Sequence, residues 1–302
     1  MTQHAQVIVI TGCSTGIGLA LAVMLAKDQQ KRYKVYATMR NLSKRKALDE
    51  ATPGELDSTL FVRELDVTKD DSVNTFFTNL LKETGRIDVL VNNAGIALCA
   101  AFEYIPIETI RHVLETNFYG PVRTIRGVLP KMKEQRSGKI INISSLLGVF
   151  GAPFTETYAA SKFALEGMSE CLVSTLRKFN IYVSTVQFGH VQTDAIKNME
   201  LLHKDIDVSK ADETTLKLIK ANDRARQKTM TGNMCQTADE AAKFIIGIIQ
   251  EDTPKFRYQP SKGSHDMVAT KLKDASGEEQ VHSAIQTYFR AARVSSFALS
   301  KL

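Results

Sequence analysis

Tyr158 and Lys162 are the two side chains of this 302-residue sequence whose types and spacing point most directly to proton transfer. Residues four apart share one face of a helix, so the phenol and the ammonium are expected to lie close together. A tyrosine has an ordinary pKa of about 10, which is too high for proton exchange at neutral pH, and a nearby positive charge lowers it. Tyr158 is therefore expected to give a proton to a carbonyl or to take one from an alcohol.

Two polar side chains precede this pair. Ser145 follows an expected strand over 139–143, where its hydroxyl can polarise the oxygen of a substrate. Asn117 lies within a long helix expected over 108–132. A Tyr-x-x-x-Lys pattern alone occurs by chance in many proteins and then marks an ordinary helix face. The catalytic interpretation therefore depends on all four residues together.

A glycine-rich turn stands between the first expected strand, 7–11, and the first expected helix, 17–26. Glycines in such a turn let backbone N–H groups approach a pyrophosphate, and the helix N-terminus favours its negative charge. Many loops need glycine for other reasons, but the strand–turn–helix context predicts a dinucleotide site. The residues expected to form it are Gly12, Ser14, Thr15, Gly16, Ile17 and Gly18.

The end of the second expected strand, 35–38, predicts which dinucleotide is bound. Sites for NAD(H) normally carry an acidic residue about 20 positions after the glycines, where it binds the ribose 2′-hydroxyl. This sequence has Met39 and Arg40 there. The guanidinium of Arg40 suits a 2′-phosphate, and the hydroxyls of Ser14 and Thr15 can add donors, so NADP(H) is favoured over NAD(H). The alternative is that Arg40 is only a solvated charge.

The third and fourth expected strands, 60–65 and 89–91, end in further polar and small residues. A carboxylate there can accept a hydrogen bond from an adenine amino group, a short amide can brace neighbouring backbone, and a glycine lets the cofactor pass. Ordinary turn chemistry is the alternative explanation. The residues expected at the site are Asp66, Val67, Asn93, Ala94 and Gly95.

The elements that must position these residues alternate between apolar β-type runs and longer helical patterns. Further strands are expected over 182–187 and 256–258, and further helices over 72–83, 158–179 and 238–249. Such alternation predicts an α/β fold, a Rossmann-type doubly wound parallel sheet of about seven strands with helices on both faces. Because no linker or repeat divides the chain, one catalytic domain over 1–302 is favoured over two.

A polar stretch at 193–233 interrupts this alternation and is expected to contain a helix over 213–227. Since the core pattern resumes after it, we interpret it as a lid insertion above the sheet, followed later by a C-terminal tail over 262–302. Cations on the stretch 216–228 of the lid form either a solvated face or a surface that attracts an acidic substrate or a membrane. They are Lys217, Lys220, Arg224, Arg226 and Lys228.

Composition excludes several classes of protein. The 43% hydrophobic and 24% charged residues are typical of globular domains. The net charge is only +6, and no zinc-finger, RNP or basic–aromatic pattern accompanies it, so nucleic-acid binding is not expected. Four scattered cysteines predict reduced thiols in an intracellular compartment, and a metal site is not expected. No apolar run is long enough for a membrane helix.

The chain ends in Ser300-Lys301-Leu302, the tripeptide that an import receptor reads as a peroxisomal address when its carboxylate is free. A chance ending on a frayed tail is the alternative. We therefore expect a peroxisomal or a cytoplasmic protein, with the peroxisomal import receptor as a partner in the first case.

In order and spacing, these motifs resemble the short-chain dehydrogenase/reductase family, and the match runs from about residue 5 to residue 260. The resemblance implies that Tyr158 is the general acid/base and that Lys162 lowers its pKa and binds the nicotinamide ribose. It also implies that Ser145 orients the carbonyl and that Asn117 holds a water in a proton relay. Hydride passes directly between cofactor and substrate carbon in this family, so no metal is needed.

Segments 34–40, 161–167 and 272–277 resemble a subgroup that contains 17β-hydroxysteroid dehydrogenase type 1 and photoreceptor-type retinol dehydrogenase. This closer resemblance implies NADP(H) as cofactor and a lipophilic alcohol or ketone, a steroid or a retinoid, as substrate. It also implies a homodimer through the helices expected over 108–132 and 158–179.

The sequence departs from the family after the sixth expected strand, where Pro-Gly-(Pro)-Val-x-Thr usually holds the nicotinamide carboxamide. Val191 and Thr193 are retained and are expected at the cofactor, but His190 replaces a proline, which predicts a more mobile loop. For His190, a hydrogen-bonded loop residue is favoured over a catalytic group.

Two other functions were weighed against this assignment. A peroxisomal reductase of a fatty-acyl or other anionic lipid carbonyl fits the C-terminal tripeptide and the basic lid, which would also suit peripheral contact with a membrane. A catalytically inactive NADP(H)-binding regulator is a different class, and the intact set of Asn117, Ser145, Tyr158 and Lys162 argues against it.

Overall fold

A single parallel sheet organises the chain in the computed structural model, which describes residues 4–193, 202, 204, 206–230 and 235–289. Its strand order is β3-β2-β1-β4-β5-β6-β9, which confirms the predicted fold class. The expected strand positions are correct to within about two residues. The strands are β1 (Gln6–Ile10), β2 (Tyr33–Met39), β3 (Leu60–Glu64), β4 (Val89–Asn92), β5 (Gly138–Ile143), β6 (Ile181–Val186) and β9 (Arg257–Tyr258).

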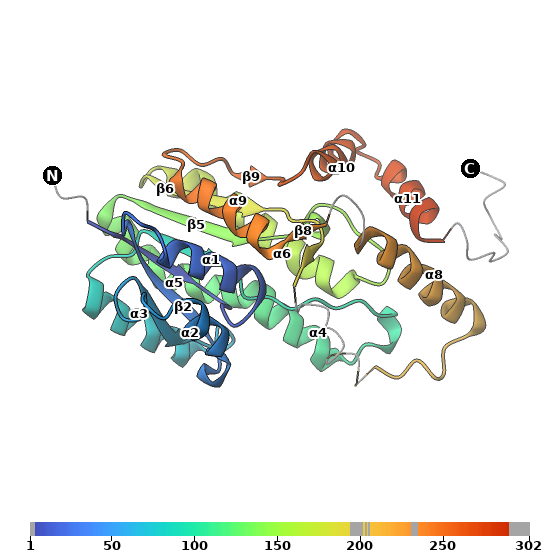
Figure 1. The fold of residues 1–302 in the computed structure, drawn as a ribbon. Helices are drawn as coiled ribbons and strands as arrows, with labels where there is room; N and C mark the ends of the chain where they lie inside the picture. Colours follow the sequence, from blue (N-terminus) through green and yellow to red (C-terminus); the bar gives the residue numbers. More distant parts are fainter. Residues whose placement is uncertain (1–3, 194–201, 203, 205, 231–234, 290–302) are drawn as a thin grey trace.

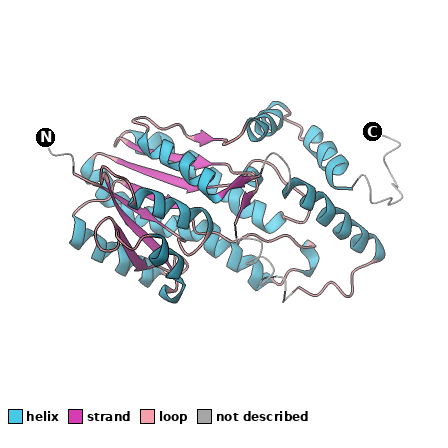
Figure 2. Cartoon of the chain, in the orientation of Figure 1, coloured by secondary structure: helices cyan, strands magenta, loops and turns pink. Residues whose placement is uncertain are grey.

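Helices cover both faces of the sheet (Figures 1 and 2). Successive residues of a strand point to opposite faces, so Ile8 and Ile10 of β1 pack with α1 and α9, while Val7 and Val9 pack with α3, α5 and α6. The short α2 (Lys46–Ala51) follows β2. The covering helices are α1 (Gly16–Ala26), α3 (Asp70–Thr84), α5 (Gly120–Gln135), α6 (Glu156–Arg177) and α9 (Ala238–Gln250).

The strand order reverses direction between β1 and β4. Ile8 of β1 pairs with Val35 of β2 on one side and with Val89 of β4 on the other. The chain therefore builds one half of the sheet outward from β1 and then returns to build the other half from β4. In open parallel sheets the crevice at such a reversal, beyond the carboxyl ends of the strands, is where ligands bind.

The helix expected over 108–132 is present, but it contains a π-helical turn that was not predicted. The structure has α4 (Ile107–Leu114), then a π-helical turn (Glu115–Tyr119), then α5. Pro121 has no N–H and cannot give the α-helical hydrogen bond to the Asn117 carbonyl, which breaks the regular pattern. A π turn within a helix is frequently found at a functional site.

The two ends of the expected lid insertion are held side by side. The short strands β7 (Val191–Gln192) and β8 (Gln236–Thr237) pair in parallel, and α8 (Glu213–Met230) lies between them in the chain. Because this pairing encloses the polar stretch, it is consistent with a lid on one domain. The division into domains itself stays a prediction.

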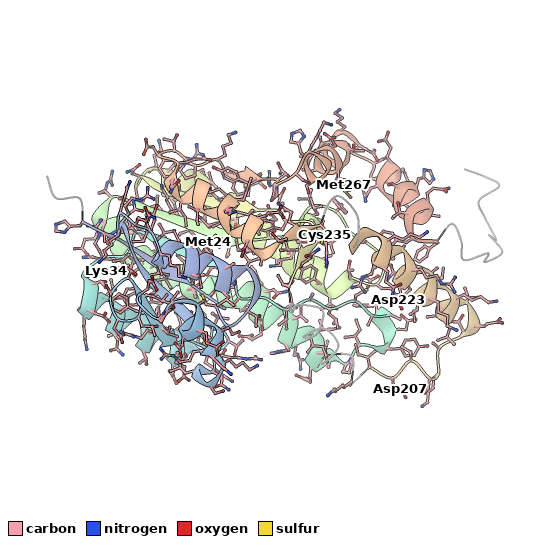
Figure 3. The ribbon with its side chains drawn as sticks, viewed as in Figure 1. Met24, Lys34, Asp207, Asp223, Cys235 and Met267 are labelled. Carbon is pink, nitrogen blue, oxygen red and sulfur yellow. The ribbon has the colours of Figure 1, made fainter. Side chains whose placement is uncertain are left out.

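The C-terminal tail is helical, which the sequence did not predict. It contains α10 (Lys262–Lys273) and α11 (Glu278–Ala284) and a final π turn (Ile285–Phe289), which contacts α8. Figure 1 shows α8 and α11 beside each other beyond one end of the sheet. In Figure 3, Met267 and Cys235 lie toward this end of the molecule, whereas Lys34 lies at the opposite end. The residues Ser300-Lys301-Leu302 lie outside the described part of the chain.

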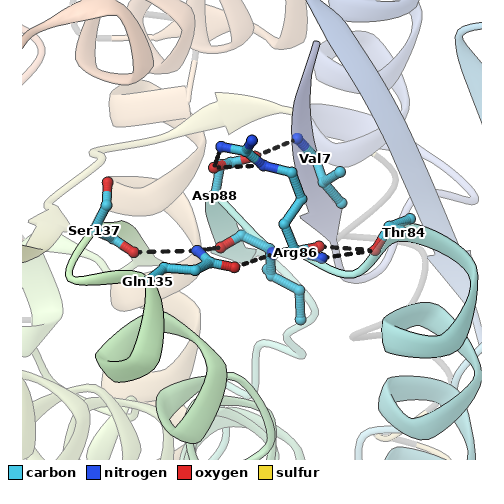
Figure 4. A network of polar contacts seen from close by, with 7 residues as sticks. Val7, Thr84, Arg86, Asp88, Gln135 and Ser137 are labelled. Carbon is cyan, nitrogen blue, oxygen red and sulfur yellow. Dashed lines mark hydrogen bonds and ion pairs between the residues drawn. The ribbon is translucent and has the colours of Figure 1, made fainter. Parts of the chain in front are cut away.

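The starts of β1 and β4 are joined by a polar network at the end of the sheet away from the crevice (Figure 4). Oδ2 of Asp88 accepts the Val7 N–H at 2.8 Å, and Arg86 forms an ion pair with Asp88 at 2.7 Å. The Gln135 amide accepts from the Ile87 N–H and donates to the Ile87 carbonyl. These bonds hold together the starts of β1 and β4, the two strands between which the strand order reverses.

Two composition-based expectations can be compared with the structure. All four cysteines are free thiols, as predicted. Within the described ranges, none of the helices has the length and apolarity that crossing a membrane requires.

Candidate active site

The lid and the tail enclose a cleft of about 800 Å³ over the carboxyl ends of the strands. A volume of this size is typical of small-molecule and cofactor sites. Sixteen of the eighteen sequence-predicted site residues line the cleft, so residues spread from 12 to 193 are brought together at one place. The exceptions are Gly18 and Asn117, which lie behind its wall.

The glycine turn brings the backbones that follow β1 and β4 into direct contact. Gly12 has a positive φ of 73°, and a Cβ placed on it would lie 2.8 Å from the Ala94 Cα. A Cβ on Gly18 would lie 2.5 Å from the Gly12 carbonyl oxygen. The Thr193 methyl group lies over Gly16, 3.0 Å from where its Cβ would be. Only glycine allows this packing. The turn formed by residues 12–18, which we call the cradle, therefore depends on main-chain geometry.

Asn93 braces the same turn with its side chain. Its Nδ2 donates to the carbonyl oxygens of Thr11 at 2.9 Å and Gly12 at 3.0 Å. The N–H groups of Asn93 and Ala94 each donate to the Thr11 hydroxyl at 3.0 Å. The amide therefore stabilises the turn and lines the cleft beside it.

The N-terminus of α1 is suited to an anion. Its N-cap residue, Thr15, makes no side-chain capping bond, and its first turn carries no acidic residue. The N–H groups of that turn have no intrahelical partners, and together with the helix dipole they favour a phosphate. This end of the cleft therefore fits the pyrophosphate of a dinucleotide.

Arg40 is exposed directly after β2 and lines the cleft, as does Lys44, which the sequence reasoning missed. Lys44 belongs to a short 3₁₀ turn (Leu42–Lys44) that the sequence pattern did not reveal. Two cations and no carboxylate at this strand end fit a 2′-phosphate.

Asp66 has one oxygen engaged within its own turn. Its Oδ1 accepts hydrogen bonds from the N–H and the hydroxyl of Thr68, at 2.9 and 2.7 Å, and its own N–H donates to Ser72. Turn chemistry therefore accounts for one carboxylate oxygen, and the half-buried side chain also lines the cleft.

Tyr158, Lys162 and Ser145 meet at the centre of the cleft. Tyr158 and Lys162 lie one turn apart on α6, and the Lys162 Nζ is 5.8 Å from the centre of the Tyr158 ring. Nζ donates to the Ile143 carbonyl at 2.8 Å, and the Ser145 Oγ accepts the Leu147 N–H at 3.1 Å. The phenol and the amine are therefore on the same side of the helix.

The expected lowering of the Tyr158 pKa by Lys162 is not what the groups of this chain produce. Burial raises the pKa of Tyr158, and only its hydrogen bond with Ser145 works in the opposite direction. Burial also lowers the pKa of Lys162 to about 8. Desolvation disfavours the charged form of both groups, and it is the largest cause of the pKa shift of each.

Asn117 connects two elements of the site from behind the wall of the cleft. Its Oδ1 accepts the Ile96 N–H at 2.9 Å, and its Nδ2 donates to the Ile96 carbonyl and to the Ser161 hydroxyl. The side chain is thus a brace between the loop after β4 and helix α6. Its role in a proton relay stays a prediction.

The lid presents two polar side chains to the cleft that the sequence analysis did not single out as a pair. Asn222 is only 1% exposed; its Nδ2 lies 3.6 Å from the Cys99 Sγ, and its Oδ1 has no hydrogen-bond partner among the described residues. Arg226, one turn later, is half-buried and also lines the cleft. Their i, i+4 spacing on one helix face was the available signal.

Most of the five cations of the stretch 216–228 are exposed, which fits both a solvated face and a surface that attracts a membrane. Lys217, Lys220, Arg224 and Lys228 are exposed, and only Arg226 turns toward the cleft. The tail adds Met267 and Tyr288 to the cleft wall, which sequence reasoning also missed.

His190 lines the cleft beside Val191. Burial and the nearby charge of Arg226 lower its pKa, so its imidazole is neutral at pH 7. Its carbonyl accepts the Gln236 N–H at 3.0 Å, which ties the loop to β8.

Comparison with known proteins agrees with this geometry. The model of the short chain dehydrogenase family matches residues 6–202. Retinol dehydrogenase 8 of Bos taurus is 36% identical over 299 residues, covering 99% of this chain and 95% of its own. The 17-beta-hydroxysteroid dehydrogenase type 1 of Homo sapiens is 34% identical over 281 residues, covering 91% and 83%.

A solved structure described as ElxO with NADP bound superposes with a TM-score of 0.69 and 25% identity, covering 87% of this chain and 99% of that one. The sequence match, the sheet and the arrangement of the cleft agree on one assignment: the chain belongs to the short-chain dehydrogenase family, a family of NAD(P)-binding oxidoreductases.

Proposed function

We propose that this protein is an NADP(H)-dependent oxidoreductase that interconverts a carbonyl and an alcohol on a lipophilic small molecule. One observation carries the proposal: Tyr158 and Lys162 lie together in the cleft that also contains the N-terminus of α1 and Arg40. The two relatives, named for retinol and for 17-beta-hydroxysteroids, support a lipophilic substrate.

Each residue at the centre has a definable task. Bound NADPH would supply the hydride. Tyr158 gives its phenolic proton to the carbonyl oxygen, and the ammonium of Lys162 stabilises the phenolate that remains. The Ser145 Oγ accepts the Leu147 N–H and its O–H bonds Tyr158 in this structure; with a substrate bound, that O–H would donate to the substrate oxygen instead. In alcohol oxidation the same proton moves in reverse.

The cofactor is held from two ends in this proposal. The glycine turn and the first turn of α1 bind the pyrophosphate, and Arg40 and Lys44 bind the 2′-phosphate. Asp66 and Val67 flank the adenine, while Val191 and Thr193 hold the nicotinamide carboxamide. These contacts favour NADP(H) over NAD(H).

The lining of the substrate end favours a steroid over a retinoid. Leu147, Phe150 and Met267 provide apolar walls. The unpaired oxygen of buried Asn222 and the charge of Arg226 favour a substrate with a second polar group far from its reacting carbonyl. A steroid with two oxygen functions has such a group, whereas the distal end of retinal is hydrocarbon.

A reductase of an anionic lipid carbonyl, such as a 3-ketoacyl-CoA, is the second candidate. The observation that favours it is the guanidinium of Arg226, which faces the cleft while the other lid cations face solvent. A negatively charged group at the far end of the substrate would pair with this cation.

A panel of substrates tests the proposal. Purified protein is mixed with estrone, all-trans-retinal or a 3-ketoacyl-CoA, and oxidation of NADPH or NADH is followed by absorbance. We expect the rate of estrone reduction with NADPH to be well above the rate with NADH. In an Arg40→Ala variant the ratio of the NADPH rate to the NADH rate should fall by about tenfold or more. Faster turnover with NADH would refute the cofactor assignment, and turnover of none of the three carbonyls would refute the substrate class.

The proposal extends to assembly and location. A homodimer through α4, α5 and α6 is supported by Tyr119 and Phe163, which are 48% and 45% exposed on or beside these helices. The tripeptide Ser300-Lys301-Leu302 supports a proposal of peroxisomal import, and the exposed cations of α8 support a proposal of peripheral membrane contact.

A further inference from the structure

Glu166 is a buried carboxylate for which the proposed reaction has so far no use. It lies on α6 one turn after Lys162 and two turns after Tyr158, and it is 5% exposed. Its Oε2 accepts the Thr185 hydroxyl at 3.1 Å and the Arg257 Nε at 3.4 Å. Its Oε1 has no hydrogen-bond partner within the described ranges.

Packing alone does not call for a carboxylate at this position. Removing an ionised group from water is costly unless both of its oxygens are satisfied. Replacing a buried ion pair by apolar residues of similar volume is often neutral or stabilising. A half-satisfied buried charge one helical turn from Lys162 therefore points to a role in the site.

The charged and polar groups around Glu166 come from each element packed against it. On α6 itself these are Lys162 and Glu170, on β9 Arg257 and on β6 Thr185. The turn after β5 adds Ser144: a Cβ on Gly148 would lie 2.9 Å from the Ser144 Oγ and 3.1 Å from the Glu166 Cγ. Lys162 is thus the cation on the cleft side of Glu166, and Arg257 the cation on its outer side.

Lys162 needs a counter-charge because it is as buried as Glu166. It is 5% exposed, and its Nζ is held by a neutral carbonyl, that of Ile143. Burial lowers the pKa of Lys162 to about 8, and the charge of Glu166 acts in the opposite direction. Without that charge, a larger share of Lys162 would be a neutral amine at physiological pH.

We propose that Glu166 is a positioning residue for the reaction, whose buried carboxylate keeps Lys162 in the ammonium form that the Tyr158 phenolate requires. This inference rests on the proposed function. Glu166 does not touch the substrate; it acts through Lys162. Arg257 contacts the Glu166 carboxylate from the surface side. It also contacts Glu170, to which its Nη2 donates at 2.8 Å.

The test compares Glu166→Gln with Glu170→Gln. Both changes remove a carboxylate that contacts Arg257, but the Glu170 side chain is 62% exposed and that of Glu166 is 6% exposed. The kcat/KM for carbonyl reduction with NADPH is measured from pH 6 to 10. The wild type is expected to lose activity as the pH rises through about 8, because the ammonium of Lys162 is lost there.

The Glu166→Gln variant should move this falling limb down by about one pH unit, a loss of about fivefold at pH 8 and about tenfold at pH 9 with little change at pH 6. Glu166→Asp, which keeps the charge, should return the falling limb most of the way to its wild-type pH. Glu170→Gln should leave the limb at its wild-type pH. A falling limb that stays at its wild-type pH in Glu166→Gln, with activity reduced equally at all pH values, would overturn the proposal.

Binding of NADPH, followed by its fluorescence over the same pH range, separates this inference from the proposed function. If no carbonyl is reduced but the pH at which affinity falls still shifts in Glu166→Gln, the proposed reaction fails and the role of Glu166 stands. If neither profile shifts, the role of Glu166 is refuted. Should Glu166→Gln not fold, Glu166→Met removes the charge without leaving an unpaired amide, and the same shift is expected.

Discussion

The cofactor side and the substrate side of the cleft are built in different ways. On the cofactor side the contacts are made mainly by the backbone: the turns after β1 and β4 touch through Gly12 and Ala94, and the Asn93 side chain donates to the carbonyls of Thr11 and Gly12. On the substrate side, the tail packs against α8 and, through side chains, against the loop before α6, as in the edge-to-face contact of Phe154 with Phe289.

This difference predicts which part of the cleft tolerates substitution and which part does not. A cradle made of close backbone contacts accepts few substitutions, and it binds groups that all dinucleotides share. A wall made of side chains on a lid and a tail can change one residue at a time, and with it the substrate. The two sides should therefore respond differently to mutation.

The largest effect is expected where the two sides meet, at Tyr158. A Tyr158→Phe variant loses the exchangeable proton but keeps the ring, so kcat should fall by about 10²–10⁴-fold while NADPH affinity changes little. Steady-state kinetics and NADPH fluorescence titration measure the two quantities. Tyr182→Phe, on strand β6 outside the cleft, is the control and should behave as wild type. An unchanged rate in Tyr158→Phe would remove the proposed acid/base.

A smaller effect, confined to the cofactor side, is expected at Gly18. A Cβ there would lie 2.5 Å from the Gly12 carbonyl oxygen and from the Asn93 Nδ2, so Gly18→Ala must displace the cradle. We expect NADPH binding to weaken by about 10- to 100-fold, equivalent to about 1–3 kcal/mol of packing strain. Titration of NADPH fluorescence measures the change.

Gly247→Ala in α9 is the matched control for Gly18→Ala. No atom lies within 4 Å of the Cβ position at Gly247, and alanine is the better helix former by about 0.5–1 kcal/mol. Thermal unfolding should show a variant at least as stable as the wild type, with unchanged affinity for NADPH. Equal loss of NADPH affinity in both variants would contradict the backbone-contact explanation.

The same difference decides how much the sequence could predict. The glycine turn, the Tyr158–Lys162 pair and the strands are local sequence patterns with a known structural cause. The structure has each of them where the sequence predicted it. The π turn at Glu115–Tyr119 was missed because Pro121 was overlooked within an otherwise helical pattern. The expected lowering of the Tyr158 pKa, which counted on the positive nicotinamide as well as on Lys162, is opposed within this chain by burial, which no spacing reveals.

The substrate wall was beyond sequence reasoning for a physical reason. Asn222, Met267 and Tyr288 come from three separate elements and meet only after the lid and the tail have packed. Each has an ordinary alternative explanation in its own segment. Helices α10 and α11 carry short, weakly periodic patterns, so even the elements that bring Met267 and Tyr288 to the cleft were not predicted.

The smallest effect is expected on this wall, at Asn222. Replacing it by leucine removes the buried amide and adds apolar surface, so a steroid with two oxygen functions should lose about 0.5–1.5 kcal/mol, or about twofold to tenfold in kcat/KM. All-trans-retinal, which has no distal polar group, should be turned over equally well or better. Asp223→Ala, at the exposed neighbouring position, should leave kcat/KM for both substrates unchanged.

The ratio of the two kcat/KM values is the decisive quantity for Asn222→Leu, because a fall in both would indicate only a damaged lid. NADPH affinity should stay at the wild-type value, since Asn222 belongs to the side of the cleft that the cofactor does not reach in our proposal. A variant that weakens NADPH binding, or lowers turnover of both substrates by the same factor, would show that the two sides of the cleft are not independent.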